Sequence, residues 1–535
     1  MKENNMFKDK FFWAALLAGG FFLLLTLWYS FGMDQAICAY VAWVWKDHHL
    51  APYVGSWDLT YPGIFVVYRL AMHLFGESIL GFRIFDLLVQ ITSLAMIYFL
   101  AKKVSGSQPA AFLSCLIYGI FYFGLGRWSA GNREVYVLWL FFAALFVSFA
   151  GRGLRRALAA GLLIGFAPLI KPPFGLAWLV FGILFLAQGI KEKRKIPWLE
   201  LVVYSFCCFL PASAFILYYS QIGRLNDLYQ SLIWYNFNVY ARVTPLAFSG
   251  DPYLKFFSLS RVIFLEQPLL LFSALFFSFF KLTARPAQNQ NFKLWLSIVS
   301  LSLVSLIALI LQAKYFSYHL IPFWGLLIIL AGPGFYQMAL RLNGPDAHLR
   351  RRLIPGIFSA AIVILLILNV KAEQLKFAAQ YCFRNIEPAY FSKYESASDY
   401  GLVTNYYLPA NYLKRMLRPQ DQVEVFGVQP LLPFLLKKKL PSRFQNIQHL
   451  VYTPLDRTIS ATQKQWIQEY TSAVISARPR FFIITDQEIP LSVDLSRPTV
   501  KTALSEQFPE LNRFLDQNYR LIQKIGLTEI YELNP

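Results

Sequence analysis

Long apolar runs recur along this chain, and each has roughly the length that crosses a membrane. A helix needs about 20 apolar residues to span the hydrocarbon core of a bilayer. The pattern therefore predicts a polytopic α-helical membrane protein with about 11 spans. The predicted spans are Phe11 to Phe31 and runs near 79–101, 109–127, 134–150, 157–170, 174–190, 198–220, 262–281, 294–312, 317–340 and 354–371.

The composition agrees with a membrane protein. Hydrophobic residues make up 56% of the 535 residues and charged residues only 15%, whereas a soluble chain carries about a quarter charged residues. This excludes a soluble enzyme, a disordered or fibrous protein and a disulfide scaffold. The five cysteines show no CxxC or Cys/His spacing. No phosphate loop or dinucleotide motif occurs, so no cofactor is expected; a divalent metal is compatible with the sequence but is not indicated.

The formal charge of +20 has a topological explanation. Basic residues gather in alternate loops, at 102–103, 152–156, 191–195, 281–293 and 341–352. Such loops lie in the cytoplasm of a polytopic membrane protein, so we expect no nucleic-acid partner. The interpretation predicts a plasma-membrane protein, in a bacterium the inner membrane. Its N-terminus is cytoplasmic, and an odd number of spans leaves the C-terminal segment outside the cell.

The chain changes in character near residue 372, where polar residues, Pro and Asn become frequent. We therefore predict a transmembrane domain at 1–371 and an extracytoplasmic α/β domain at 372–535. Short buried strands are expected at Val423 to Gly427 and Phe481 to Thr485. The helices expected there cover 396–417, 460–477 and 505–518.

The first outer loop, 32–78, is the most informative region for function. Asp34 opens a stretch with apolar residues at helical spacing, and a second short helix is expected from Gly63 to Phe75. We predict two helices lying in the membrane interface. A poorly solvated Asp34 would suit a general base. It would equally suit an N-cap for the helix that follows, and both interpretations stay open.

Two further outer sites are candidates for substrate binding. Trp57 and Asp58 form an acidic site, although a turn residue before Pro62 is the favoured alternative for Asp58. The loop from Arg127 to Glu134 holds two cations, the amide of Asn132 and the carboxylate of Glu134. These groups suit a sugar and a phosphate. The alternative is that Arg and Trp side chains anchor the helix end at the membrane interface.

Three cationic or titratable residues lie at the outer ends of predicted spans. Lys171 stands between two apolar helices, and ionisable groups at that depth are costly and usually face a cavity. Lys314 and His319 flank the start of another span. Together with Arg127 they would suit the phosphate of a lipid. Interface anchoring for Lys314, and hydrogen-bonded packing for His319, are the alternatives.

The order of these motifs resembles the C-type integral-membrane glycosyltransferases. The residues that carry the resemblance are Asp34-Gln35-Ala36, Trp57 to Phe65, Leu74-Phe75-Gly76, Asn132-Arg133-Glu134, Lys171-Pro172, Tyr318 to Pro322, Val425-Phe426-Gly427 and Lys439 to Arg443. The nearest branch is similar to bacterial protein O-mannosyltransferases and to the lipid A aminoarabinose transferase.

The resemblance implies a reaction. Such enzymes take a sugar from a polyprenyl-phosphate carrier on the outer face of the membrane. They transfer it, usually with inversion, to a hydroxyl of a lipid, glycan or protein. Asp34 would be the base, and Arg127, Lys171, Lys314 and His319 would hold the phosphate.

The chain also departs from the family pattern. Asp34 is followed by Gln35 where the family often has a second acid, and Thr60-Tyr61 stand where it often has Lys-Pro. Two rival functions stay open. One is a transporter or flippase for a lipid-linked sugar, although a transporter would more often show inverted halves with matched broken helices, which are not seen in the sequence. The other is an inactive scaffold for envelope assembly, which the Thr60-Tyr61 departure keeps open.

Overall fold

The computed structural model describes residues 8–151, 153–193, 196–243, 259–261, 263–284, 291–312, 314–342, 363, 403–453, 458–489 and 498–535. The chain forms two compact units, each built from separated stretches. Unit 1 comprises Met1–Ser30, Leu74–Tyr218 and Pro252–Cys382, and unit 2 comprises Phe31–His73, Tyr219–Asp251 and Phe383–Pro535. Apart from residue 363, the predicted span 354–371 and the predicted boundary after it lie outside the described residues.

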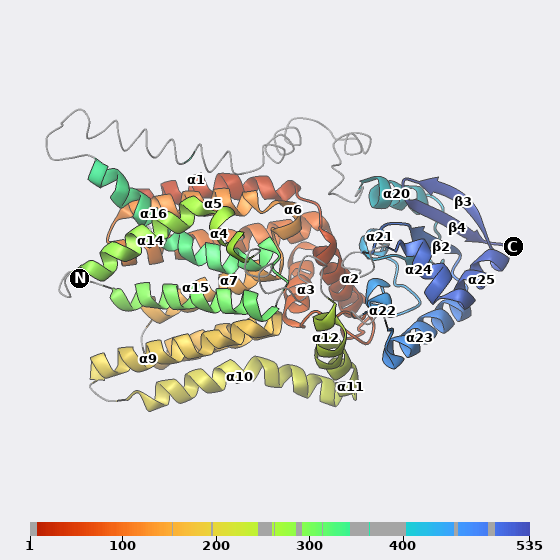
Figure 1. Cartoon of the computed structure of the whole chain (residues 1–535), viewed down its shortest axis with the longest axis horizontal. Coiled ribbons are helices and arrows are strands. Elements are labelled where there is room, and N and C mark those ends of the chain that lie inside the picture. The colour runs from red at the N-terminus through yellow and green to blue at the C-terminus, as the bar shows by residue number, and fades with distance from the viewer. Residues whose placement is uncertain are drawn as a thin grey trace. The chain divides into compact units, whose positions relative to one another are not determined.

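Unit 1 is a bundle of apolar helices (Figure 1). Its elements are α1 (Lys10–Leu24), η2 (Leu25–Trp28), α4 (Ile79–Ser105), α5 (Gln108–Gly124), α6 (Gly126–Ser129), α7 (Arg133–Ala150), α8 (Gly153–Ile170), η3 (Pro172–Leu176), α9 (Ala177–Lys193), α10 (Trp198–Gln221), α14 (Pro268–Thr283), α15 (Phe292–Gln312), η8 (Ser317–Leu320) and α16 (Ile321–Leu342).

The spanning helices match the predicted runs. Among the described residues, eight helices are long and apolar enough to cross a membrane, and a bent pair that includes α14 would make a ninth. With the shorter apolar helix α5, they coincide with the predicted runs up to 317–340. The prediction of a polytopic helical membrane protein is confirmed, while the total of about 11 spans stays a prediction.

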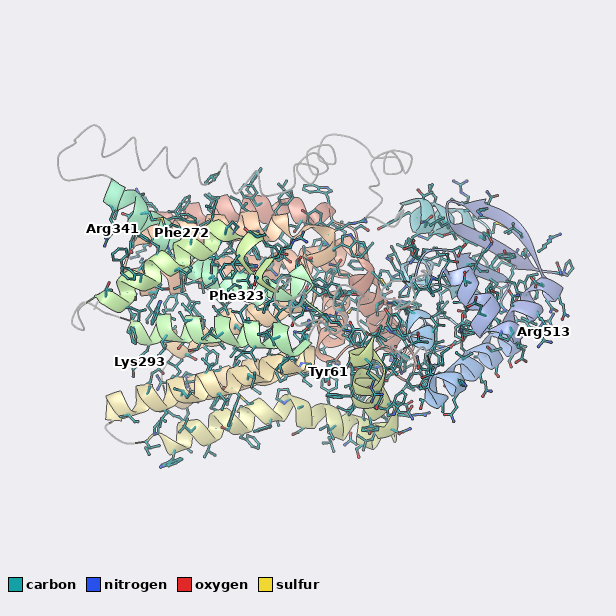
Figure 2. All side chains as sticks on the ribbon, in the orientation of Figure 1. Tyr61, Phe272, Lys293, Phe323, Arg341 and Arg513 are labelled. Atoms are coloured by element: carbon teal, nitrogen blue, oxygen red, sulfur yellow. The ribbon has the colours of Figure 1, made fainter. Side chains whose placement is uncertain are left out.

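Small residues let two of these helices approach closely. Gly161 and Gly165 lie four residues apart on α8, and a Cβ on either would overlap a main-chain oxygen of α10. Glycine is therefore required at this contact, as at other close helix crossings in membranes. The outer face of α10 exposes large apolar side chains such as Phe206 and Phe209. Phe272 of α14 is similarly exposed (Figure 2), as expected for faces that contact lipid.

Unit 2 combines short helices with a small sheet (Figure 1). Its elements are α2 (Met33–Asp47), α3 (Gly63–Phe75), α11 (Leu225–Tyr229), η4 (Gln230–Trp234), α12 (Tyr235–Asn238), η5 (Tyr240–Arg242), η10 (Val403–Tyr407), α20 (Leu408–Lys414), β1 (Val423–Phe426), α21 (Leu431–Leu436), α22 (Gln448–Val451), α23 (Ala461–Ala477), β2 (Phe481–Thr485), α24 (Val500–Gln507), α25 (Pro509–Asn518), β3 (Tyr519–Ile525) and β4 (Thr528–Leu533).

The sheet has the order β1-β2-β4-β3. The two predicted strands are β1 and β2, which pair in parallel, and β4 pairs antiparallel with both β2 and β3. The β3–β4 hairpin was not predicted, although Gly526 at φ +60° supplies its tight turn. The helix predicted at 505–518 divides at Phe508, before Pro509, into α24 and α25. The first part of the helix predicted at 396–417 lies outside the described residues.

An aromatic core joins the separated stretches of unit 2. Trp57 of the first outer loop, Tyr235 of α12 and Trp466 of α23 pack together, with ring centroids 4.9–5.9 Å apart. Helix α2 is buried at every position from Gln35 to Val44, so it has no wholly exposed face. The predicted location of α2 and α3 at the membrane interface stays a prediction.

Candidate functional site

A buried carboxylate at one end of the unit 1 bundle gathers two of the predicted residues. The Glu134 side chain is fully buried, and its Oε1 forms an ion pair with Lys171 Nζ. The same oxygen lies 3.7 Å from His319 Nε2. Glu134 Oε2 and His319 Nδ1 are buried, and neither has a hydrogen-bond partner among the described residues. We call Glu134, Lys171 and His319 the Glu134 group.

The sequence explains why these three side chains meet. Asn132 caps α7 by accepting a hydrogen bond from the Arg133 amide, which places Glu134 in the first turn of the helix. Lys171 is the residue at which α8 gives way to η3, because Pro172 and Pro173 follow it. His319 lies in η8, at the entry to α16.

The surroundings of the Glu134 group are positively charged. The charges of Lys171, Arg133 and Lys314 all act on the His319 ring. Lys314 is itself buried, and its burial lowers the pKa of its ammonium to about 8. Lys171, Arg133 and Lys314 thus bring positive charge to the surroundings of His319 and Glu134, and buried positive charge favours an anion. The chemistry of the group therefore suits a phosphate.

Arg127 is placed differently from the other predicted cations. It lies on α6, with its guanidinium 5.5 Å from the centre of the Trp128 ring. The contacts that define the Glu134 group come from Lys171 and His319 instead. The cation–π contact agrees with the alternative of interface anchoring for Arg127.

In unit 2, Asp34 lies in the first turn of α2. The N-cap is Gly32, whose amide donates to Gln35 Oε1 at 2.9 Å. The interpretation of Asp34 as the N-cap is therefore wrong, because the helix begins one residue before Asp34 at Met33. A carboxylate in the first turn still interacts favourably with the helix dipole. The Asp34 side chain is partly exposed, so it differs from the buried acids of both units.

Trp57 and Asp58 are both almost fully buried, at 1% and 2% exposure. Asp58 Oδ1 accepts a hydrogen bond from the Thr60 amide, and Oδ2 lies 3.5 Å from His449 Nε2. Burial raises the pKa of Asp58, but the contacts with His449 and Thr60 outweigh burial and hold the pKa below its usual value. This environment agrees with the turn residue favoured in the sequence analysis. Whether either residue touches substrate stays a prediction.

Two kinds of comparison relate this chain to known proteins. Residues 60–215 match the family described as dolichyl-phosphate-mannose-protein mannosyltransferase. ArnT from Cupriavidus metallidurans bound to undecaprenyl phosphate is 14% identical, with a TM-score of 0.57 over 97% of both chains. The apo structure of the same ArnT is 13% identical, with a TM-score of 0.60 over 97% of this chain and 96% of that chain. A search among curated protein sequences finds no match.

The chain has an ArnT-like fold. The resemblance seen in the sequence is thereby confirmed, and so is the polytopic helical fold with a small sheet domain near the C-terminus. The match to ArnT extends through the tail as well as the membrane helices, since it covers nearly all of both chains.

Unit 2 also contains a tethering residue, Arg443, which the sequence analysis named only as part of the family resemblance. Arg443 donates to both carboxylate oxygens of Glu469 at 2.8 and 3.0 Å and to Asp227 at 2.7 Å. Its carbonyl accepts from the Trp57 amide at 2.7 Å. Arg443 thus ties α23, α11 and the first outer loop together within unit 2. The sequence feature that could have drawn attention to Arg443 is its position directly after Pro441-Ser442.

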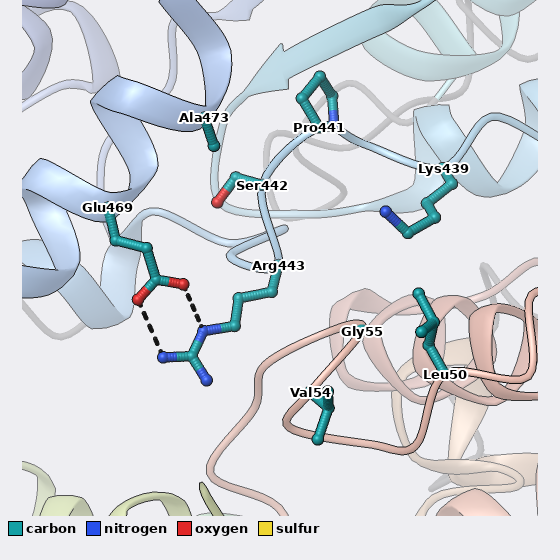
Figure 3. A pocket seen from close by; sticks show the side chains of 9 residues that line it. All are labelled: Leu50, Val54, Gly55, Lys439, Pro441, Ser442, Arg443, Glu469 and Ala473. Carbon is teal, nitrogen blue, oxygen red and sulfur yellow. Dashed lines mark hydrogen bonds and ion pairs between the residues drawn. The ribbon is translucent and has the colours of Figure 1, made fainter. Parts of the chain in front are cut away.

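A hollow of about 210 Å³ lies beside Arg443. Figure 3 shows the paired Arg443 and Glu469 on one side of it and Lys439 with Leu50 on the other. The polar ends of Arg443 and Glu469 are engaged with each other, so a completed ion pair borders one side of the hollow. Among the described residues, no cluster of three or more His, Cys, Asp or Glu side chains fits a metal ion.

Proposed function

We propose that this protein is a glycosyltransferase that takes its sugar from a polyprenyl-phosphate carrier. The acceptor is a hydroxyl of a lipid, glycan or protein at the outer face of the plasma membrane. The match to the mannosyltransferase family and the likeness to ArnT, which was solved with undecaprenyl phosphate, support the proposal. The observation that carries it is the Glu134 group, where cations lie close to two buried atoms, Glu134 Oε2 and His319 Nδ1, that have no hydrogen-bond partner among the described residues.

The cations act on the leaving group. As the bond between the anomeric carbon and the phosphate oxygen breaks, the lipid phosphate gains negative charge. Lys171 and Lys314 stabilise that charge. This electrostatic interaction is strongest where water is excluded. Glu134 orients the Lys171 ammonium and keeps the empty site from accumulating too much positive charge. His319 and Arg127 are the remaining candidates for contacts with the phosphate.

The base in this proposal is Asp34. It takes the proton of the acceptor hydroxyl while the hydroxyl oxygen attacks the anomeric carbon from the face opposite the phosphate. One C–O bond forms as another breaks, so the sugar is transferred with inversion. The partly exposed carboxylate in the first turn of α2 supports this role, since an acceptor must be able to reach it.

The sugar is recognised, in this proposal, by Asn132 and Glu134 at the start of α7. Both are buried and polar, and polar side chains fix the orientation of a ligand that is otherwise held by shape. Hexose and pentose donors are both compatible with these groups. Trp57 and Asp58 are proposed to support the shape of unit 2, because Trp57 is part of its hydrophobic core and the adjacent Asp58 is buried.

Transfer from defined donors tests the proposal. Purified protein in lipid nanodiscs is mixed with a panel of radiolabelled polyprenyl-phosphate sugars and membrane-lipid or glycan acceptors. Wild type is expected to transfer label from at least one donor, and Asp34→Asn to lose about 1000-fold in rate, within the range expected for general-base catalysis. Asp47→Asn is the matched control, because Asp47 ends the same helix in an ion pair with Lys46.

Each outcome of this test is informative. Equal transfer by wild type and Asp34→Asn contradicts the assignment of the base while keeping the enzyme. Absence of transfer from every donor contradicts the enzyme itself. Movement of the intact lipid-linked sugar between leaflets would then support the transporter, and its absence would support the scaffold.

A further inference from the structure

Two charged residues are buried inside the spanning helix α4, and the proposed reaction does not use them. Arg83 and Asp86 lie three residues apart on α4, and each is 0% exposed. Ionisable side chains within a membrane-spanning helix are costly and rare, and they usually serve a function. Their contacts show what that function is.

Arg83 binds main-chain oxygens at two places in unit 1. Its Nε donates to Tyr29 O at 2.9 Å and its Nη2 to Ser30 O at 2.6 Å, at the end of the first span. Its Nη1 donates to Ala130 O at 2.7 Å. Charge-assisted hydrogen bonds of this length are strong, so Arg83 fixes the backbone of the 130–132 loop against the end of the first span.

Asp86 holds the same loop through a tyrosine. Its Oδ2 accepts from the Tyr122 hydroxyl at 2.5 Å, and that hydroxyl accepts from the Gly131 amide at 2.9 Å. Asp86 Oδ1 accepts from Tyr136 on α7 at 3.3 Å and from Gln90 at 3.1 Å. The carboxylate therefore fixes both the loop before α7 and the second turn of α7.

Gly131 completes the contact between the loop and α4. Its φ of +78° is a left-handed conformation that favours glycine, and a Cβ there would lie 3.0 Å from Arg83 Nη1. The loop thus lies directly on the Arg83 side chain. Asn132, the cap of α7, follows at once, and Glu134 comes two residues later.

We propose that Arg83, Asp86 and Tyr122 are positioning residues that set the start of α7 and, through it, the direction of the Glu134 carboxylate. This inference rests on the proposed function and extends it, because it names the residues that hold the phosphate-binding group in place. Arg83 and Asp86 both direct their polar atoms at the backbone and side chains around one loop.

A pair of tyrosine variants separates positioning from stability. Tyr122→Phe removes the hydroxyl that links Asp86 to the Gly131 amide. Tyr118→Phe is the matched control: Tyr118 lies one turn earlier on α5, is equally buried, and donates to Gln90 Oε1 at 2.7 Å. Tyr122→Phe loses two buried hydrogen bonds and Tyr118→Phe loses one. Both variants are therefore expected to lower the melting temperature by a few degrees, Tyr122→Phe by somewhat more.

The readout is the affinity of the full chain in nanodiscs for a polyprenyl phosphate without sugar. Tyr122→Phe is expected to weaken binding about tenfold, and Tyr118→Phe by less than about twofold. In the transfer assay, Tyr122→Phe raises the donor KM and leaves the acceptor KM unchanged. Equal affinities for the two variants would overturn the inference. If wild type binds no polyprenyl phosphate, the proposed function fails instead.

A double-mutant cycle tests whether Tyr122 acts through Glu134. Glu134→Gln removes the charge that the network is proposed to orient. If the network works through that carboxylate, Tyr122→Phe costs about tenfold in the wild-type background and almost nothing in Glu134→Gln. Fully additive losses would overturn the inference, because Tyr122 would then act independently of Glu134.

Discussion

Each unit of this protein buries an acid beside a histidine, but the two pairs have different surroundings. In unit 1, Glu134 lies 3.7 Å from His319, and in unit 2, Asp58 lies 3.5 Å from His449. Cations surround the first pair. Aromatic rings surround the second, with the Trp57 ring centre 5.4 Å from that of His449.

The difference shows how burial alone misleads about function. Asp58 accepts a hydrogen bond from its own turn, at the Thr60 amide, and lies in a core of aromatic side chains. Glu134 leaves Oε2 without a hydrogen-bond partner among the described residues. His449 Nε2 in the Asp58 pair is likewise buried without such a partner. The neighbouring cations, not the unsatisfied atom alone, therefore make the Glu134 group better suited to an anionic ligand. The pair of Asp58 and His449 is better suited to stabilising the fold of unit 2.

Removing the cation from the Glu134 group has the largest expected effect on donor binding. Lys171→Ala removes a cation that is proposed to bind the donor phosphate, and it leaves the Glu134 carboxylate buried without its ion-pair partner. Donor affinity is therefore expected to fall about 100-fold, which corresponds to about 2.7 kcal/mol. The acceptor KM changes little. Lys281→Ala is the control, because Lys281 donates to Val104 O near the opposite end of α4. A donor affinity equal in the two variants would contradict the phosphate assignment.

Another buried acid, Glu424 of β1, shows how burial changes the pKa of a carboxyl group that is not paired with a histidine. Burial outweighs the hydrogen bond from Tyr470 and raises the pKa of Glu424 to about 8. An exposed glutamate loses its proton near pH 4.5. Stability is therefore full below that pH and falls as the pH rises towards 8, by about 1.4 kcal/mol for each pH unit between the two values.

Glu424→Gln tests this pH dependence, because the amide does not titrate. The variant is expected to exceed wild type in unfolding free energy at pH 8 and to lose that advantage near pH 4. Pulse proteolysis across this range, followed by peptides from the sheet of unit 2, measures the difference. Parallel curves for the two proteins would mean that Glu424 does not titrate in this interval.

A smaller effect is expected at the Asp58–His449 pair of unit 2. Asp58→Asn keeps an acceptor for the Thr60 amide but removes the charge facing His449. We expect unit 2 to lose about 1–2 kcal/mol of stability while donor affinity stays at the wild-type value. Hydrogen exchange in unit 2 and a donor-binding assay measure the two quantities. A loss of donor affinity at unchanged stability would restore Asp58 as a substrate contact.

The smallest effect is a pH dependence at Lys314. Because its pKa is lowered to about 8, the ammonium loses its proton as the pH rises from 7 to 9. A phosphate monoester is already fully ionised above pH 7, so only the lysine changes. Affinity for a polyprenyl phosphate should fall about fivefold over this range. Lys314→Arg, which stays charged, should show a flat profile, and a similar fall in that variant would exclude Lys314 as the cause.

The fold was predicted well from the sequence wherever a long hydrophobic pattern determines the secondary structure. Apolar runs of spanning length leave a helix as the main solution in a membrane, because every backbone polar group must be satisfied internally. The predicted strands β1 and β2 were equally clear, since both are buried along their whole length. The β3–β4 hairpin was missed because most of β3 is exposed or half-exposed, which weakens its alternation.

The candidate site was only partly predictable. Glu134, Lys171 and His319 were each found because charges are scarce at span ends, but sequence does not reveal that they contact one another. Arg83 and Asp86 were missed because they fall inside a run that reads as an ordinary span. Their spacing of three residues on one helix face was the available signal, and only the structure shows that both reach the 130–132 loop.

The assembly of unit 2 from three separated stretches affects how the protein is made. The hydrogen bond from Ser56 Oγ to Gln445 Oε1 joins residues 389 positions apart. A ribosome adds about 5–20 residues per second, so roughly 20–80 s pass between the synthesis of the two. During that interval Trp57 lacks the tail residues that bury it in the finished protein. The first outer loop of the nascent chain therefore depends on protection until the tail has been synthesised.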